Sequence, residues 1–194
     1  MGERVITATR LRDDQRLAVE LDGEAWIALD PLDAARLGLD VGTILDDAGI
    51  ADAEALAARD GALRRGARMV GRRSHARGEL ERKLARTSGD EAAREAADRL
   101  AAMGAVDDER HARDLAAQRL AAGWGPARIA HDLAAAGVAD GVITATLAAL
   151  DPADVLDAAR RAAGDRAGAA GWQRLAARGF DEDVAERLLG LPDA

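Results

Sequence analysis

The chain has 194 residues, a formal net charge of −8 at neutral pH and no cysteine. Disulfides and thiolate metal sites are therefore excluded, and a reducing, cytoplasmic location is expected. No apolar run approaches the roughly 18 residues that cross a bilayer, and Met1-Gly2-Glu3-Arg4 leads into no signal-peptide core, so we expect no membrane contact.

Residues 1–60 are predicted to form a small β-rich N-terminal domain with a connecting helix. We expect its strands at about 4–11, 16–21 and 24–29. Asp22-Gly23 between the last two strands predicts a type I′ hairpin turn, because this pair readily adopts positive φ angles. Asp30-Pro31 then predicts the start of a short helix, and a longer helix is expected from about Asp52.

The rest of the chain is predicted to consist of tandem three-helix repeats, at residues 61–104, 105–150 and 151–194, the last one irregular. Equivalent leucines recur about every 40 to 50 residues, a period typical of helical repeat arrays, at Leu84, Leu133 and Leu175. The predicted fold class is therefore mainly α. We expect the repeats to form an elongated curved array beside the hairpin-containing N-terminal domain.

Helix boundaries within the repeats follow from apolar spacing and from breakers. Leu63, Ala67 and Val70 fall on one helical face and predict the buried side of the first helix. The second repeat is predicted to have helices at about 108–122, 126–136 and 140–150, with Pro126 at a first helical position.

The segment 62–86 carries nine basic residues against two acidic ones, Glu79 and Glu81. The nine, called the basic cluster below, are predicted to form a continuous patch on two consecutive helices: Arg64, Arg65, Arg68, Arg72, Arg73, Arg77, Arg82, Lys83 and Arg86. A solvated helix face is the alternative, although exposed helices ordinarily interleave both signs. Such a patch suits phosphates or an acidic protein surface, and charge alone does not distinguish them.

Trp124 lies in the glycine-flanked loop Gly123-Trp124-Gly125-Pro126. Tryptophan is enriched at binding hot spots, so partner contact is one interpretation, and packing between repeats is the other. The loop lacks the Lys-Ser/Thr of a phosphate-binding loop. With one Phe, three Trp and no Tyr in the chain, an autonomous platform for stacking nucleobases is not expected.

The histidines offer only weak candidates for chemistry. His75 with Glu79 and His111 with Asp114 have helical spacings that fit two corners of a metal site, and a metal-dependent enzyme using His111 and His131 is a third class of function. Polar pairs on helix surfaces explain the same spacings. We therefore expect no catalytic residue, no metal and no cofactor.

Several motifs, taken in order, resemble the RecX family of regulators of the RecA recombinase. The motifs are Leu21-Asp22-Gly23-Glu24, Leu37-Gly38-Leu39, Arg77-Gly78-Glu79-Leu80-Glu81-Arg82-Lys83-Leu84, Val106-Asp107-Asp108-Glu109-Arg110, Gly123-Trp124-Gly125-Pro126-Ala127-Arg128-Ile129 and Arg178-Gly179-Phe180. The resemblance implies a non-enzymatic protein that lodges in the groove of the RecA–DNA filament. There it would limit filament growth, ATP hydrolysis, strand exchange and co-protease activity in DNA repair and recombination.

The resemblance also guides the expected contacts. We assign partner or DNA contact to the basic cluster, Trp124 and Arg128, with the RecA filament and the single- or double-stranded DNA within it as partners. The chain is expected to be a monomer. The alternative is a nucleic-acid-binding helical adaptor that acts through 62–86. Ala76 stands where the family often has a capping serine, so the second helix of the first repeat is expected to begin at Ser74 or to fray.

Overall fold

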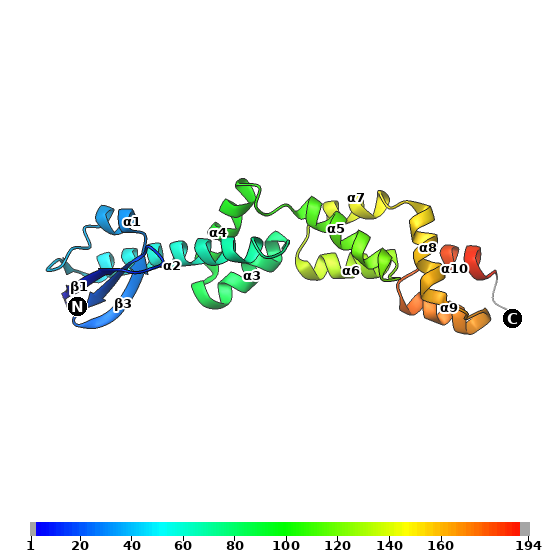
Figure 1. The fold of residues 1–194 in the computed structure, drawn as a ribbon, viewed down its shortest axis with the longest axis horizontal. Helices are drawn as coiled ribbons and strands as arrows, with labels where there is room; N and C mark the ends of the chain where they lie inside the picture. Colours follow the sequence, from blue (N-terminus) through cyan, green and yellow to red (C-terminus); the bar gives the residue numbers. More distant parts are fainter. Residues whose placement is uncertain (1–2, 191–194) are drawn as a thin grey trace. The chain divides into compact units, whose positions relative to one another are not determined.

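The computed structural model describes residues 3–190, and their contacts divide the chain into two compact units. Unit 1 comprises Met1–Arg73 and Leu80–Ala105, and unit 2 comprises Ser74–Glu79 and Val106–Ala194. The predicted fold class is confirmed in that the chain is mainly helical with a small antiparallel sheet near its N-terminus (Figure 1). The division into four segments inferred from sequence stays a prediction.

The sheet in unit 1 has four antiparallel strands in the order β3-β2-β1-β4. They are β1 (Arg4–Leu11), β2 (Leu17–Leu21), β3 (Glu24–Leu29) and β4 (Ile44–Leu45). Asp22 and Gly23 have φ angles of 52° and 83°, so the predicted hairpin turn between β2 and β3 is confirmed. The strand β4 was not anticipated, because two residues carry no recognisable alternation.

Two aspartates start the first helices of unit 1. The Asp30 carboxylate accepts a hydrogen bond from the Leu32 amide and caps α1 (Pro31–Arg36), as predicted. The helix α2 (Asp47–Val70) begins five residues before the expected Asp52. The reason is Asp46, whose side chain accepts a hydrogen bond from Gly49 N at 2.8 Å and so supplies the N-cap.

The buried face of α2 differs from the predicted one. Ala67 is exposed, whereas Ala62 and Gly66 are buried. Gly66 lies against leucines of α3 (Arg77–Ser88) and α4 (Asp90–Ala102), and a Cβ there would lie 2.7 Å from Leu100 Cδ1. Glycine is not scored as an apolar residue when a helical pattern is read from sequence, so Gly66 was overlooked. The predicted buried face of α2 was therefore displaced by one residue.

Unit 2 contains the remaining helices packed around one apolar core. They are α5 (Asp108–Ala121), α6 (Pro126–Ala136), α7 (Asp140–Ala148), α8 (Pro152–Ala163), α9 (Gly168–Ala177) and α10 (Glu182–Leu189). Ile129, Leu133 and Leu175 are fully buried in this core, and Phe180 is nearly so. Residues 77–79 also belong to unit 2, so the boundary between the units falls within α3.

Candidate partner-binding surface

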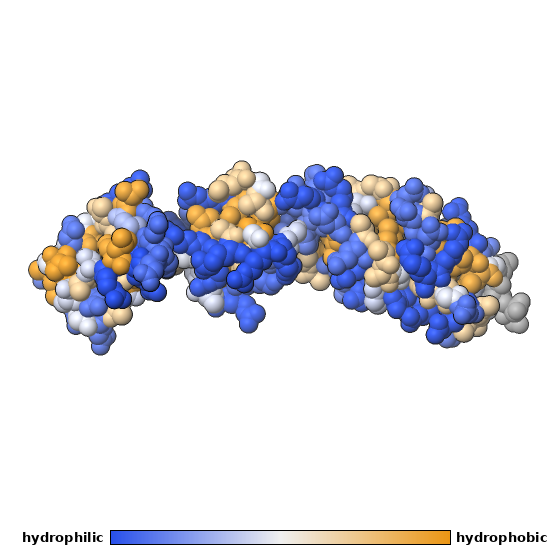
Figure 2. Space-filling view, viewed as in Figure 1, coloured by the Kyte–Doolittle hydropathy of each residue, from blue (hydrophilic) through white to orange (hydrophobic). Residues whose placement is uncertain are grey.

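The basic cluster divides between the two units. Arg77 belongs to unit 2, and the other eight members belong to unit 1. Figure 2 shows hydrophilic residues gathered over the region where Figure 1 places the C-terminal half of α2 and α3. Arg68, Arg72, Arg73, Arg82, Lys83 and Arg86 are exposed, and the rest are partly buried.

Two of these arginines hold unit 1 together. Arg64 Nε donates to Asp60 Oδ1 at 2.9 Å, and its Nη2 lies 3.4 Å from Asp30 Oδ2. The hydrogen bond to Asp60 raises the pKa of the Arg64 guanidinium above its ordinary value. Arg65 Nη1 donates to Thr87 Oγ1 and, at 2.9 Å, to Ser88 Oγ, which fastens the end of α3 to α2. Both guanidinium groups therefore bind other side chains within the fold.

Not all members of the basic cluster lie on helices, and this corrects the prediction. The helix α2 ends at Val70 with Gly71 as its C-cap, so Arg72 and Arg73 lie in the connection before α3. The connection continues through His75 and Ala76, which are both buried in unit 2. The chain is therefore non-helical from Gly71 to Ala76, between the end of α2 and the start of α3.

The N-terminus of α3 is capped by a distant side chain. The helix starts at Arg77, not at Ser74, and Asp108 Oδ1 accepts a hydrogen bond from the Arg77 amide at 2.7 Å. Ser74 Oγ lies 2.8 Å from His111 Nδ1, and Ala76 is part of the unit 2 core. Asp108 thus supplies the cap that Ala76 does not provide. The expected start at Ser74 is therefore wrong.

Three arginines of the basic cluster remain available for a partner. Among residues 3–190, Arg68, Arg72 and Arg86 form no ion pair and no side-chain hydrogen bond, and all three are exposed. Arg73, Arg82 and Lys83 are also exposed but interact within the chain. Exposed guanidiniums without a carboxylate neighbour leave a positive potential that favours an anionic surface.

Trp124 is half-buried and is covered by two guanidinium groups. Arg178 Cζ lies 4.2 Å and Arg128 Cζ 5.0 Å from the centroid of its ring. Arg178 also donates to the Ala122 carbonyl at the C-terminus of α5. Asp132 accepts hydrogen bonds from Arg119 and Arg128 and so holds Arg128 in place. The geometry favours the second interpretation of Trp124, packing between the second and third predicted repeats.

A close backbone contact lies beside this tryptophan. Gly125 N donates to the Arg178 carbonyl at 2.8 Å, and Ala127 N donates to the Gly179 carbonyl at 3.0 Å. A Cβ on Gly125 would overlap Gly179, whose own φ of 82° is in the left-handed region. A related contact joins Gly78 to Gly137, where a Cβ on Gly78 would lie 2.9 Å from the Gly137 oxygen.

Sequence reasoning assigned no role to Arg178 or to these close glycine contacts, and it did not predict that Asp108 caps α3. A signal existed, because Asp108, Gly125, Arg178 and Gly179 all stand inside motifs that resemble the RecX family. Their roles depend on which segments meet in space, and a single sequence does not reveal that.

The remaining candidates for chemistry are the three histidines. His75 and His111 are buried in unit 2, while His131 is exposed on α6. Within residues 3–190, no group of three or more His, Cys, Asp or Glu side chains is placed to hold a metal ion. In the same part of the chain, no helix is both long and apolar enough to traverse a lipid bilayer.

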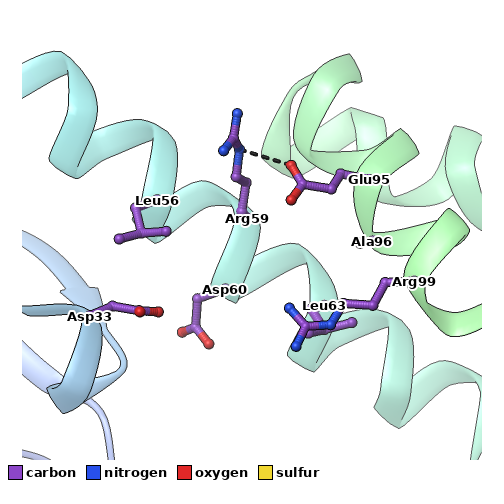
Figure 3. A pocket seen from close by; sticks show the side chains of 8 residues that line it. All are labelled: Asp33, Leu56, Arg59, Asp60, Leu63, Glu95, Ala96 and Arg99. Atoms are coloured by element: carbon purple, nitrogen blue, oxygen red, sulfur yellow. Dashed lines mark ion pairs between the residues drawn. The ribbon is translucent and has the colours of Figure 1, made fainter. Parts of the chain in front are cut away.

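Unit 1 has a cavity of about 130 Å³ where α1, α2 and α4 meet (Figure 3). Arg59 and Glu95 point toward one another across it, with Arg59 Nε 2.9 Å from Glu95 Oε2. Asp60, which lines the cavity, forms ion pairs with Arg16 and Arg64. Most of the charge lining the cavity is therefore neutralised by the chain itself.

Comparison with known proteins identifies the family. A model of the second three-helix domain of RecX matches residues 107–147. The regulatory protein RecX of Xanthomonas campestris pv. campestris (strain B100) is 37% identical over 120 residues, which cover 57% of this chain and 74% of that protein. The chain belongs to the RecX family.

Other RecX proteins agree with this assignment. RecX of Pseudomonas entomophila (strain L48) is 37% identical over 135 residues, covering 64% of this chain and 87% of that protein. RecX of Halorhodospira halophila is 42% identical over 98 residues, but the match spans 50% of this chain and 58% of that protein. These relatives are named regulatory proteins.

Two solved RecX structures share the fold. A crystal structure of regulatory protein RecX has a TM-score of 0.69 at 18% identity and covers 95% of this chain and 98% of its own. RecX from Lactobacillus salivarius has a TM-score of 0.59 at 16% identity, covering 68% and 94%. The RecX domain model spans α5, α6 and all but the last residue of α7, so Asp108, Trp124 and Arg128 lie inside the matched segment.

Proposed function

We propose that this chain is a non-enzymatic regulator of the RecA recombinase. It binds the RecA–DNA filament and mostly inhibits its growth, its ATP hydrolysis, strand exchange and co-protease activity. The observation that carries the proposal is membership of the RecX family, whose members here are named regulatory proteins. A cytoplasmic, monomeric protein without a cofactor remains our expectation.

The basic cluster supports the proposal as a contact surface. A filament of protein on DNA offers phosphates and acidic side chains, and both attract exposed guanidinium groups. Arg68, Arg72 and Arg86 suit this role best because their side chains have no partner among residues 3–190. Trp124 and Arg128 contribute less directly, since each is engaged with its neighbours in unit 2.

The direct test is a RecA ATPase assay on single-stranded DNA. Adding the purified chain should depress steady-state hydrolysis in proportion to its concentration. Bovine serum albumin at equal mass controls for non-specific effects. Unchanged hydrolysis at several-fold molar excess over RecA would contradict the proposal.

A nucleic-acid-binding adaptor is the second candidate, and the unpaired arginines of the basic cluster are the observation that favours it. It predicts DNA binding without RecA that weakens steeply with salt, because each neutralised phosphate releases counterions. Titrating labelled DNA at two salt concentrations distinguishes the candidates. Strong binding without RecA, together with unaltered RecA hydrolysis, would favour the adaptor.

A further inference from the structure

A groove of about 380 Å³ lies between α5 and α7 in unit 2. Figure 2 shows pale, weakly hydrophobic residues over the position that Figure 1 gives to α7. Its lining is mainly apolar and comes from the two helices: Glu109 and Arg113 of α5, and Gly141, Val142, Ala145, Thr146 and Ala149 at α7 and its C-cap. None of these residues belongs to the basic cluster or to the surroundings of Trp124.

The side of the groove formed by α7 is a row of small residues. Gly141, Ala145 and Ala149 recur at every fourth position, so they lie on one helical face, and all three are exposed. A Cβ added to Gly141 would meet nothing within 4 Å. Short side chains along one face let the axis of a second helix approach closely. The shape therefore suits a helix as occupant.

Thr146 adds a polar requirement to the same groove. It is 7% exposed, and its hydroxyl has no hydrogen bond to any of residues 3–190. Within that range, the fully enclosed side-chain atoms that lack a hydrogen bond are Arg16 Nε and Asp60 Oδ2, which form an ion pair with each other. The Thr146 hydroxyl is not among them, so it is open to the groove that it lines. Water satisfies the hydroxyl while the groove is open, and a molecule that displaces this water has to supply a hydrogen-bonding group in its place.

The corresponding helices of unit 1 are joined in a different way. Arg59 of α2 lies 3.0 Å from Glu91 and 2.9 Å from Glu95, both on α4, and so bridges the two helices. Figure 3 shows the pair with Glu95. No ion pair or side-chain hydrogen bond joins residues 108–121 to 140–148. The α5–α7 groove thus has no ion pair across it, whereas Arg59 bridges α2 and α4 beside a cavity of about 130 Å³.

The rim of the groove carries one charge of each sign. Glu109 and Arg113 are exposed and stand one helical turn apart on α5. The side chain of Arg113 donates from Nε to the Glu109 main-chain oxygen at 3.3 Å, and no ion pair joins the two side chains. The two side-chain charges remain available, so a complementary helix would carry a basic and an acidic residue one turn apart.

We propose that the α5–α7 groove receives an amphipathic helix of the recombinase subunit. The helix places small apolar side chains on the face of Gly141, Ala145 and Ala149. It also presents a polar group to Thr146 and opposite charges to Glu109 and Arg113. This inference rests on the proposed function, because it names the contact through which unit 2 binds the filament.

The test fills the groove without altering its neighbours. Ala145→Trp places an indole in the groove, and Ala148→Trp places one on an exposed position of α7 outside it. Each protein is labelled at one cysteine introduced at exposed Gln173, since the chain has no other. Fluorescence anisotropy then measures binding to RecA filaments on single-stranded DNA, and circular dichroism verifies the fold. We expect Ala145→Trp to weaken binding at least about tenfold, because the indole would block the buried contact in the groove. We expect Ala148→Trp to weaken binding less than about twofold, because Ala148 lies outside the groove.

A second variant covers the case in which Ala145→Trp does not fold. Thr146→Val keeps the side-chain volume and removes only the hydroxyl, so we expect binding about 3- to 10-fold weaker. Wild-type affinity in folded Ala145→Trp, or in Thr146→Val, would overturn the groove assignment and leave the proposed function standing. If neither the wild type nor Ala148→Trp binds filaments, the proposed function fails and the inference falls with it.

Sedimentation velocity tests whether the groove is instead occupied by a second copy of this chain. If the unliganded wild type dimerises and Ala145→Trp is a monomer, the groove is an interface between two copies of this chain. That result would overturn a recombinase helix as the occupant. A monomeric wild type whose filament affinity depends on Ala145 supports it.

Discussion

Asp108 Oδ1 accepts a hydrogen bond from the backbone amide of Arg77 at 2.7 Å, across 31 residues of sequence. A carboxylate at the start of α5 therefore caps α3. The same short segment is held by Ser74 and His111, whose Oγ and Nδ1 lie 2.8 Å apart. The connection between α2 and α3 is fixed by side chains from a helix that follows it in the chain.

Asp108→Ala should lower the free energy of unfolding by about 1 kcal/mol, because it leaves an amide of the first turn of α3 without its cap. Urea denaturation followed by circular dichroism measures the loss. Glu109→Ala is the matched control, since Glu109 also lies in the first turn of α5 but caps nothing in α3. Equal effects of the two substitutions would show that the loss comes from the α5 dipole instead.

Gly125→Ala should destabilise unit 2 by several kcal/mol, about the range of severe core substitutions, because the new Cβ would overlap the backbone at Gly179. Gly141→Ala is the control for the residue change itself. It adds a Cβ in open space on α7, so it should be neutral or stabilise by up to about 1 kcal/mol. Thermal melts of both variants test the pair, and a harmless Gly125→Ala would contradict the close contact.

The Trp124–Arg178 contact should show a coupling energy of about 0.5 to 1 kcal/mol, as expected for a cation–π pair near the surface. A double-mutant cycle with Trp124→Leu and Arg178→Ala, measured by urea denaturation, isolates this value. Trp124→Leu with Arg174→Ala is the control cycle, because Arg174 donates to the Ala162 carbonyl and does not lie over the ring. A coupling near zero in the first cycle would leave Trp124 without this role in joining the repeats.

Replacing Arg68, Arg72 and Arg86 with glutamate should weaken inhibition of RecA hydrolysis at least about tenfold, because it reverses the sign of the available charge. Helicity should be unchanged, since these side chains have no partner among residues 3–190. The control replaces Arg94, Arg110 and Arg187, which are exposed on other helices, and alters net charge equally. Equal inhibition by both triple variants would make the basic cluster incidental.

The hairpin should gain stability from Asp22 at neutral pH. A hydrogen bond from Arg4 Nε, followed by one from the Val5 amide, holds the pKa of Asp22 below its ordinary value of 3.8. A lowered folded-state pKa stabilises the fold above the unfolded value, and the gain disappears as pH falls through the folded value. Asp22→Asn should therefore be less stable than wild type at pH 7.

The difference should shrink as the pH falls below about 4, where the carboxyl of the unfolded chain becomes protonated. Urea denaturation at a series of pH values measures both proteins. Asp13→Asn in the preceding loop is the control, because the Asp13 side chain forms no ion pair or hydrogen bond with residues 3–190. A pH-independent difference for Asp22→Asn would assign its effect to the turn backbone.

Local signals in the sequence determined much of this fold. Asp22-Gly23 specified the hairpin because the positive φ angles of its turn depend on those two residues alone. Asp30-Pro31 and Pro126 marked helix starts for a similar reason, since capping and a fixed proline φ act within one turn. The ordered motifs identified the RecX family without any knowledge of the tertiary contacts.

Only the tertiary structure decided which residues meet across long sequence separations. It replaced the expected start of α3 at Ser74 with one at Arg77, because Asp108 supplies the cap. It also separated the arginines of the basic cluster into structural ones, such as Arg64, and available ones, such as Arg68. Charge and periodicity along a chain do not specify these partners, because a hydrogen bond depends on distance in space and not on order in sequence.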